Sequence, residues 1–215
     1  MALVKSNVKI EDSREFDEFL DAQKVFENNN ENNDRRLDAL GYIIRHKEIK
    51  YVLRILHELF KHNDMDGHLF VDYAFAMFPN KPKRDEDFEQ MFEMLKSDNA
   101  YLRNQVIMFL QAYGEEAKDF LRKLLDNDDK DIRIFAINIL GDVRYDDSVE
   151  MLRYLLIKET AEKIPDVNVI MTAVDYLGEI GIDDDIELLN AIKQQFHAEP
   201  YVQFGIDTAI DRIKG

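Results

Sequence analysis

Apolar residues recur along this chain at intervals of three and four, the spacing of one face of an α-helix. The pattern is clear in the stretches 88–95, 117–124 and 149–156. Alternation of apolar and polar residues, which would indicate a β-strand, is not found over a convincing length. Proline (4 residues) and glycine (8 residues) are scarce, so few positions interrupt the helices. The sequence therefore predicts an all-α protein.

One helical pattern is repeated along the chain. The segments 99–111, 129–141, 166–178 and 199–211 align without gaps, and a weaker copy begins at Asp66. Each copy has apolar anchors at a first position and then four and eight residues later: Leu69, Tyr73 and Met77; Leu102, Val106 and Leu110; Ile132, Ala136 and Leu140; Val169, Ala173 and Leu177; Val202, Ile206 and Ile210. Successive first anchors are 30 to 37 residues apart, which leaves room for a second amphipathic helix in each interval. This period predicts a helical-hairpin repeat.

The ends of the repeated segments carry residues suited to helix ends. The residue three places before the first anchor is Asp66, Asn99, Asp129, Asp166 or Glu199. An Asp or Asn side chain there can accept hydrogen bonds from free backbone N–H groups, and Glu is a weaker cap whose charge still suits a helix N-terminus. Gly141 and Gly178 stand at the other end, where we expect each to adopt the left-handed conformation that stops a helix.

The segment Asp129–Gly141 reads Asp-x-x-Ile-Arg-x-x-Ala-x-x-x-Leu-Gly and resembles the second helix of a HEAT repeat, of the short bacterial kind related to phycobilisome-lyase repeats. The resemblance covers residues 66–215 well. Upstream it extends only by periodicity, where the stretches 15–26, 35–46 and 49–62 predict three more helices. It implies a right-handed α-solenoid of about six helical hairpins. We expect a single domain over residues 1–215, with residues 1–14 disordered or loosely docked.

The charge of the chain narrows the possible partners. It has 44 acidic and 28 basic residues, for a net charge of -16. This balance argues against binding nucleic acid or an anionic membrane, both of which attract clustered Lys and Arg, and it favours a basic protein partner. The chain has no cysteine, no apolar run near the roughly 18 residues that span a bilayer and no signal-peptide pattern at its start. These features predict a soluble, cytoplasmic protein.

The acidic stretch that begins at Asp126 has some features of a calcium loop. Asp126 and Asp128 occupy the first and third ligand positions of an EF-hand. Lys130 stands at the fifth position, however, and Ile137 stands at the twelfth, where a bidentate Glu is required. The stretch therefore predicts a turn between helices, with Asp129 as a capping residue, and no metal site.

The active sites of known enzymes, among them HEAT-like ones, provide the other patterns to compare with this sequence. The two histidines of residues 57–62 are five apart, roughly 140° around a helix, which does not suit a zinc protease. Deoxyhypusine hydroxylase, a HEAT-like enzyme, holds two irons through several His-Glu pairs, and this chain has one, His57-Glu58. HEAT-like DNA glycosylases rely on basic faces, whereas this chain is acidic. The similarity to bilin lyases is limited to the repeat pattern, and nothing in the sequence identifies a bilin pocket. We therefore predict no cofactor and no catalytic residues.

The positions two and six residues after each first anchor lie on the opposite side of the helix from the anchors. Many of them are apolar. Because second helices line the inner surface of HEAT arrays, we predict that a partner-binding groove includes Val71, Phe75, Asn104, Met108, Ile134, Asn138, Met171, Asp175 and Phe204. The alternative is that these side chains pack against neighbouring repeats. Two alternatives also stand for Arg103 and Arg133, which contact either acidic groups of a partner or an Asp of an adjacent repeat.

These observations predict a non-enzymatic scaffold or adaptor that binds another protein along the inner surface of the array. A second hypothesis is a HEAT-like enzyme or cofactor-binding protein, similar to a bilin lyase or a metal-dependent hydroxylase. A third hypothesis is that the acidic surface itself docks a basic partner. Ionic strength distinguishes the third hypothesis from the first, because attraction between exposed charges weakens steeply with salt.

Overall fold

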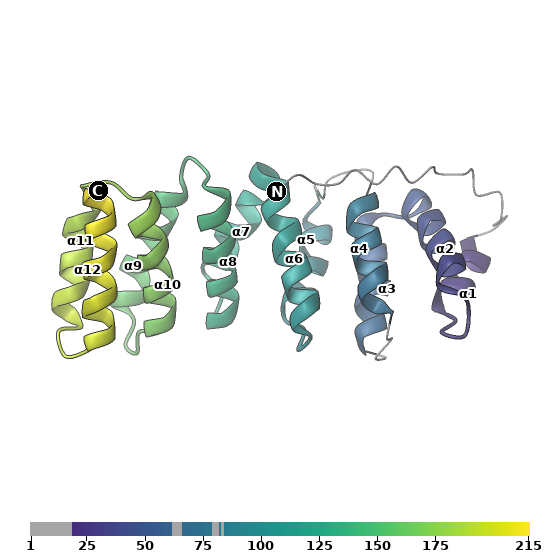
Figure 1. The fold of residues 1–215 in the computed structure, drawn as a ribbon, viewed down its shortest axis with the longest axis horizontal. Helices are drawn as coiled ribbons and strands as arrows, with labels where there is room; N and C mark the ends of the chain where they lie inside the picture. The colour runs from purple at the N-terminus through teal and green to yellow at the C-terminus, as the bar shows by residue number, and fades with distance from the viewer. Residues whose placement is uncertain (1–18, 62–65, 79–81, 83) are drawn as a thin grey trace. The chain divides into compact units, whose positions relative to one another are not determined.

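The computed structural model describes residues 19–61, 66–78, 82 and 84–215. These residues form twelve α-helices and one short 3-10 helix, and no strand occurs among them (Figure 1). The helices follow one another along the chain as six pairs, in which the odd-numbered members are called first helices and the even-numbered members second helices. The expected all-α solenoid of helical hairpins is confirmed, while its right-handed sense stays a prediction. Residues 1–14, expected to be disordered or loosely docked, lie outside the described residues.

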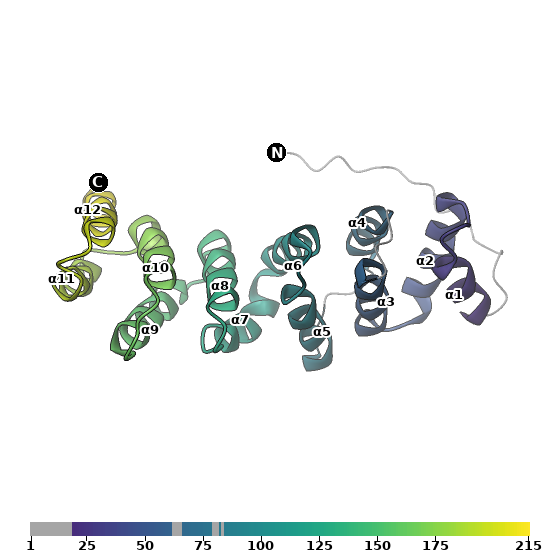
Figure 2. The same ribbon diagram turned by 90° about the horizontal axis from the view of Figure 1, so that it is seen from below.

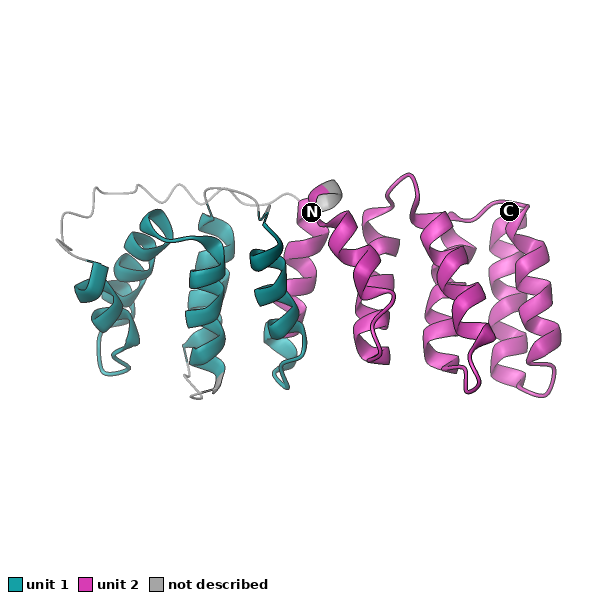
Figure 3. Cartoon of the chain, turned by 180° about the vertical axis from the view of Figure 1, so that it is seen from behind, with its two compact units in different colours: residues 1–102 teal, residues 103–215 magenta. Residues whose placement is uncertain are grey.

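The chain divides into two compact units, residues 1–102 and 103–215, and the division falls within α6 (Figure 3). The expectation of one domain over the whole chain stays a prediction, and each unit is described by itself. The helices of unit 1 are α1 (Phe19–Glu27), α2 (Asn33–His46), α3 (Ile49–Lys61), α4 (Gly67–Met77), α5 (Asp85–Leu95) and the start of α6 (Ala100–Tyr113). Within it α1 packs on α2, α2 on α4, and α3 on both α4 and α5.

Unit 2 contains the rest of α6 and three complete hairpins. Its elements are the 3-10 helix η1 (Gly114–Ala117), α7 (Lys118–Leu124), α8 (Lys130–Val143), α9 (Ser148–Ala161), α10 (Val167–Ile180), α11 (Asp185–Gln195) and α12 (Pro200–Lys214). The second helices α8, α10 and α12 lie side by side in one layer, and α7, α9 and α11 form the other (Figure 2). The predicted anchors of α8, α10 and α12 are all buried between these layers.

Side-chain caps start several helices as the sequence predicts. The carboxylate of Asp129 accepts a hydrogen bond from the N–H of Asp131 (2.9 Å), and that of Asp166 accepts from Asn168 (2.9 Å). In α6, Asn99 Oδ1 accepts from the N–H of Leu102 at 3.1 Å. Each bond satisfies a backbone donor that has no partner within the helix. The side chains of Asp66 and Glu199 accept no such cap hydrogen bond.

The core of unit 1 is built around a buried arginine. Arg36 is 1% exposed, and its guanidinium carbon lies 4.3 Å from the ring centroid of Phe70 and 5.8 Å from that of Phe26. The two rings meet edge to face at 5.3 Å. The Nε group of Arg36 donates to the carbonyl oxygen of Phe26 at 2.9 Å. A cation over aromatic faces, with its polar hydrogens bonded, thus joins α1, α2 and α4.

The buried face of α4 differs from the expected one by a single residue. Phe70 and Ala74 are fully buried, whereas the predicted anchor Leu69 is 42% exposed and Tyr73 and Met77 are half-buried. The physical reason is the packing of Phe70 against Arg36, which turns the preceding residue outward. The predicted register of this weak repeat copy is therefore wrong.

The expected helix stops at Gly141 and Gly178 are also wrong. Both glycines lie inside their helices, and α8 ends instead at Arg144, whose φ of 57° is left-handed. A Cβ on Gly141 would lie 1.9 Å from Cδ1 of Tyr176 in α10, and a Cβ on Gly178 would lie 2.8 Å from Cα of Ala209 in α12. Glycine is therefore needed here for the close approach of neighbouring second helices, not for ending them.

Candidate functional site

The residues of the predicted groove fall into two sets with different surroundings. One set stands two residues after the first anchor: Ile134 in α8, Met171 in α10 and Phe204 in α12. Met171 is buried, and its Cε would lie only 2.2 Å from a Cβ placed on Gly205 of α12. Ile134 is half-buried, and Phe204 is 74% exposed. This set therefore points toward the following helix, and Phe204 is open because no described helix covers it.

Two predicted groove residues are consequently unavailable to a partner. Met171 is buried between α10 and α12, and Val71 is fully buried in unit 1, where the register of α4 differs from the expected one. For these two side chains the alternative, packing against neighbouring helices, describes the structure. Phe75 of α4 is half-buried, and its ring centroid lies 5.8 Å from that of Phe78.

The second set stands six residues after the first anchor and remains open to solvent. It consists of the predicted residues Met108, Asn138 and Asp175, together with Thr208 at the equivalent position of α12, and these four residues are called the open row. Met108 is 59% exposed, Asp175 is exposed, and Asn138 and Thr208 are half-buried. Asn104 stands two residues after the anchor Leu102 and so belongs by position to the first set, but it is exposed as well. The open row thus combines an apolar, two neutral polar and one acidic side chain on one layer.

Polar contacts between successive second helices border the open row. Asp142 of α8 accepts hydrogen bonds from the amide of Gln111 in α6 and from the hydroxyl of Tyr176 in α10, the latter at 3.4 Å. Burial raises the pKa of Tyr176 to about 12, and the carboxylate of Asp142 adds to this, so the phenol stays protonated and can donate. Asp175 of α10 pairs with Arg212 of α12 at 2.6 Å. These bonds hold the surface residues in defined positions.

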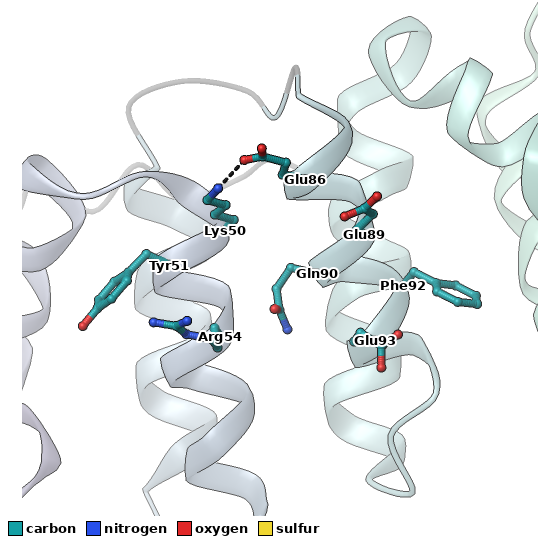
Figure 4. A pocket seen from close by; sticks show the side chains of 8 residues that line it. All are labelled: Lys50, Tyr51, Arg54, Glu86, Glu89, Gln90, Phe92 and Glu93. Atoms are coloured by element: carbon teal, nitrogen blue, oxygen red, sulfur yellow. Dashed lines mark hydrogen bonds and ion pairs between the residues drawn. The ribbon is translucent and has the colours of Figure 1, made fainter.

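Unit 1 has a pocket of about 540 Å³ between α3 and α5, which was not predicted from the sequence (Figure 4). Lys50 of α3 pairs with Glu86 of α5 at one end, and this hydrogen bond raises the pKa of the lysine. Gln90 lies between the two helices, whereas the rings of Tyr51 and Phe92 point away from the space. The pocket therefore presents charged and amide groups beside apolar atoms of its lining residues.

The sequence does contain a signal for this pocket. Basic residues recur at helical spacing at Lys50 and Arg54 of α3, and acidic residues recur on α5, at Glu86, Glu89 and Glu93. Opposite charges on facing helices indicate an ionic contact between them. Arg54 has a different partner, because its guanidinium carbon lies 5.1 Å from the ring centroid of Tyr51 on its own helix. Only the three-dimensional structure reveals that contact of the arginine side chain.

The acidic stretch that begins at Asp126 lines a second pocket, of about 390 Å³, in unit 2. Its charges are paired with one another: Lys158 Nζ lies 2.6 Å from Asp126 Oδ1, and Lys130 lies 3.6 Å from Asp166. The structure thus assigns Asp126 to an ion pair and Asp129 to the N-cap of α8. Within the described ranges, no group of three or more His, Asp or Glu side chains is arranged to hold a metal ion.

The comparison with family models identifies the repeat. A model of HEAT repeats matches residues 88–164. The chain contains HEAT repeats. Among solved structures, the crystal structure of an engineered protein is similar to this HEAT-repeat chain over 93% of its length and 97% of that chain, with 17% sequence identity and a TM-score of 0.39. No curated protein matches the chain.

Arg133, in the best-preserved HEAT repeat, pairs inside the chain. Its Nη2 group donates to Glu159 Oε1 of α9 at 3.3 Å, and Nη1 donates to the carbonyl oxygen of Asn127 at 2.7 Å. Glu159 also accepts from the N–H of Asp166 at 3.0 Å, and both charged side chains are largely buried. The expected pairing with the adjacent repeat is therefore confirmed for Arg133, with a glutamate as the partner in place of an aspartate.

The helices of this HEAT-repeat protein are short. Across the described part of the chain, none has both the length and the apolar character that crossing a membrane requires.

Proposed function

We propose that this HEAT-repeat protein is a non-enzymatic interaction module that binds another protein along the second-helix layer of unit 2. The observation that carries the proposal is the open row. Equivalent positions on the four second helices α6, α8, α10 and α12 are exposed or half-buried, while the anchors two residues before and two residues after each of them are buried. In repeat proteins, such a surface grows by one helix per repeat and suits an extended partner.

Met108 is the apolar centre of this proposed surface. It is 59% exposed on α6 and is followed along the layer by Asn138 and Asp175. An exposed methionine adapts its shape to a partner, and the neighbouring amide and carboxylate supply directional hydrogen bonds. Mixed surfaces of this kind bind through one or two apolar contacts surrounded by polar ones.

The charge of unit 2 supports a basic partner. Residues 103–215 contain 23 acidic and 13 basic side chains, a net charge of -10. A field of this sign speeds association with a basic surface and slows it with an acidic one. We therefore propose that the partner carries Lys and Arg around an apolar contact for Met108.

Two variants, made at side chains of equal exposure, test whether the partner binds at the open row. Met108→Asp places a charge in the open row, and Ile157→Asp places the same charge on α9 of the other layer, at a side chain that is also 59% exposed. Proteins captured by the wild-type chain from its own cells are compared with those captured by each variant. We expect Met108→Asp to lose a basic protein that Ile157→Asp retains. Equal loss or equal retention with both folded variants would refute binding at the open row.

The non-enzymatic part of the proposal has its own test. Elemental analysis and an absorbance spectrum of the protein purified from its native source detect a bound metal or chromophore. We expect neither at stoichiometric amount. One equivalent of either would overturn the proposal in favour of a HEAT-like enzyme or a cofactor-binding protein.

A further inference from the structure

The outer face of α12 differs in chemistry from the equivalent face of α10. On α10 this face consists of Ile170, Met171, Val174 and Gly178, all of which are buried. The aligned residues of α12 are Gln203, Phe204, Asp207 and Asp211, which are called the end face. Phe204 is 74% exposed, and both aspartates are exposed. The end face thus keeps one large apolar side chain, and its other positions carry two carboxylates and the amide of Gln203, which donates to the carbonyl oxygens of Lys193 and Phe196.

The contact between α10 and α12 shows how such a face is covered inside the protein. Met171 meets α12 at Gly205, and Gly178 meets it at Ala209, so small residues let the two helices approach closely. Phe204 stands in α12 where Met171 stands in α10. A helix placed on the end face in the same way would therefore contact Phe204 first and would bring its own side chains against the aspartates.

The two aspartates determine which side chains a docked helix needs. Asp207 already pairs with Lys193 of α11, whereas Asp211 makes no ion pair with any described residue. An apolar helix on this face would bury the Asp211 carboxylate without compensation, which is costly. An arginine or lysine would neutralise it, and an arginine can in addition lie over the ring of Phe204. Tyr201, 64% exposed and one turn before Phe204, adds a second aromatic contact.

We propose that the end face of α12 is a docking surface for a basic helical segment of another protein, with Phe204 as its apolar contact and Asp211 as its ion-pairing group. A second copy of this chain is a poor occupant. Face-to-face association would bring Asp207 and Asp211 against the same residues of the other copy, and each chain carries a net charge of -16. This proposal stands apart from the open row, since it involves neither Met108 nor Asn138.

A selection from a random peptide library displayed on phage tests the proposal with the full-length chain as bait. Parallel selections use Phe204→Ala and Asp211→Lys, with Ile157→Ala and Asp119→Lys as controls that make the same changes at exposed positions of α9 and α7. We expect the wild-type bait to enrich peptides that combine Arg or Lys with an apolar residue. Synthetic versions should bind Phe204→Ala and Asp211→Lys about tenfold or more weakly, and bind both controls and Met108→Asp as they bind wild type.

Three results would overturn the proposal. One is that no peptide is enriched. Another is that the enriched peptides are not basic, or bind Phe204→Ala and wild type with equal affinity. The third is a mass of the wild-type chain that rises with concentration and returns to that of a monomer in Phe204→Ala, which would assign the end face to a second copy. Because Phe204 is mostly exposed, circular dichroism should show the wild-type helix content in its variant.

Discussion

In unit 1 the space between α1, α2 and α4 is filled by aromatic rings around the guanidinium of Arg36, whereas in unit 2 successive second helices meet at glycines. The first arrangement depends on large side chains whose shapes match. The second depends on the absence of a side chain at Gly141 and Gly178. Unit 1 also has a glycine contact, between Gly41 of α2 and Tyr73 of α4, but the atom met there is the hydroxyl at the end of a side chain rather than a ring carbon or the backbone. The main packing contacts of the helical hairpins therefore differ between the two units.

The comparison explains why the repeat is easier to recognise in unit 2. Contacts at glycine repeat from one hairpin to the next, so the same residue types recur at the same positions. A cluster of rings around one arginine is made once, and its members come from helices with different sequences. Substitutions can test whether each unit depends on its own packing contacts.

The largest expected effect is that of Arg36→Ala in unit 1. The change removes the cation between two rings, leaves the carbonyl oxygen of Phe26 without this donor and opens a cavity. We expect a loss of about 3 kcal/mol in the free energy of unfolding. Arg36→Met keeps most of the volume and should lose about half as much.

Urea unfolding measures the loss caused by the Arg36 variants, and hydrogen exchange shows where it occurs. Protection should fall in α1, α2 and α4, because these helices meet at Arg36. If protection falls equally throughout α8, α10 and α12, the two units do not depend on separate packing contacts.

The next effect is expected for Gly178→Ala in unit 2. Alanine favours a helix by about 1 kcal/mol over glycine, but its Cβ would meet the backbone of Ala209, which cannot move alone. We expect a net loss of roughly 1–3 kcal/mol. Gly205→Ala is the matched control, because its Cβ meets only the terminal methyl of Met171, which can rotate away.

Thermal unfolding of the two glycine variants separates backbone crowding from helix preference. Gly205→Ala should be neutral or stabilising by up to about 1 kcal/mol. Stabilisation of both variants would show that the second helices of unit 2 tolerate more separation than the structure indicates, and that glycine is not required for their contact.

A smaller effect is expected from removing the side-chain caps that start helices in both units. Asp166 caps α10 of unit 2 by accepting from Asn168, and Asn32 caps α2 of unit 1 by accepting from Asp34 at 2.7 Å. Replacement of either cap by Ala should cost about 1 kcal/mol in thermal unfolding. Glu199→Ala, at the equivalent position of α12 without a cap bond, should cost less than half of that. An equal cost for Glu199 would assign the effect to charge at the helix end rather than to capping.

The sequence allowed the second helices of unit 2 to be predicted almost completely. The anchors from Ile132 to Ile210 are buried, and Asp129 and Asp166 are caps, because helical period and capping depend on residues close together in the chain. The role of the glycines was not predictable in the same way. Gly141 is required by Tyr176 and Gly178 by Ala209, and both contacts join residues more than thirty positions apart.

The candidate site shows the same division between local and distant causes. Helical geometry correctly placed Met108 and Asp175 on the side away from the anchors. It could not show that Met171 is covered, because the covering residue is Gly205 of the next hairpin. Met171 and Phe204 occupy equivalent positions, but Met171 is covered by α12, whereas no described helix covers Phe204.

The smallest effect concerns the exposed ion pair of Asp126 in unit 2. A hydrogen bond from Lys158, assisted by one from Tyr154, holds the pKa of Asp126 below its ordinary value of 3.8. The folded chain thus favours the charged carboxylate, so the pair stabilises the protein above the ordinary pKa and loses this contribution as pH falls through the lower, folded value. Asp126→Asn should cost less than about 1 kcal/mol at pH 7, because the pair is solvent-exposed. The difference from wild type should shrink below pH 4 and in high salt. The control is Asp128→Asn, which removes an exposed charge from the same loop. If both variants change the pH profile equally, net charge rather than the pair with Lys158 determines the acid sensitivity of this loop.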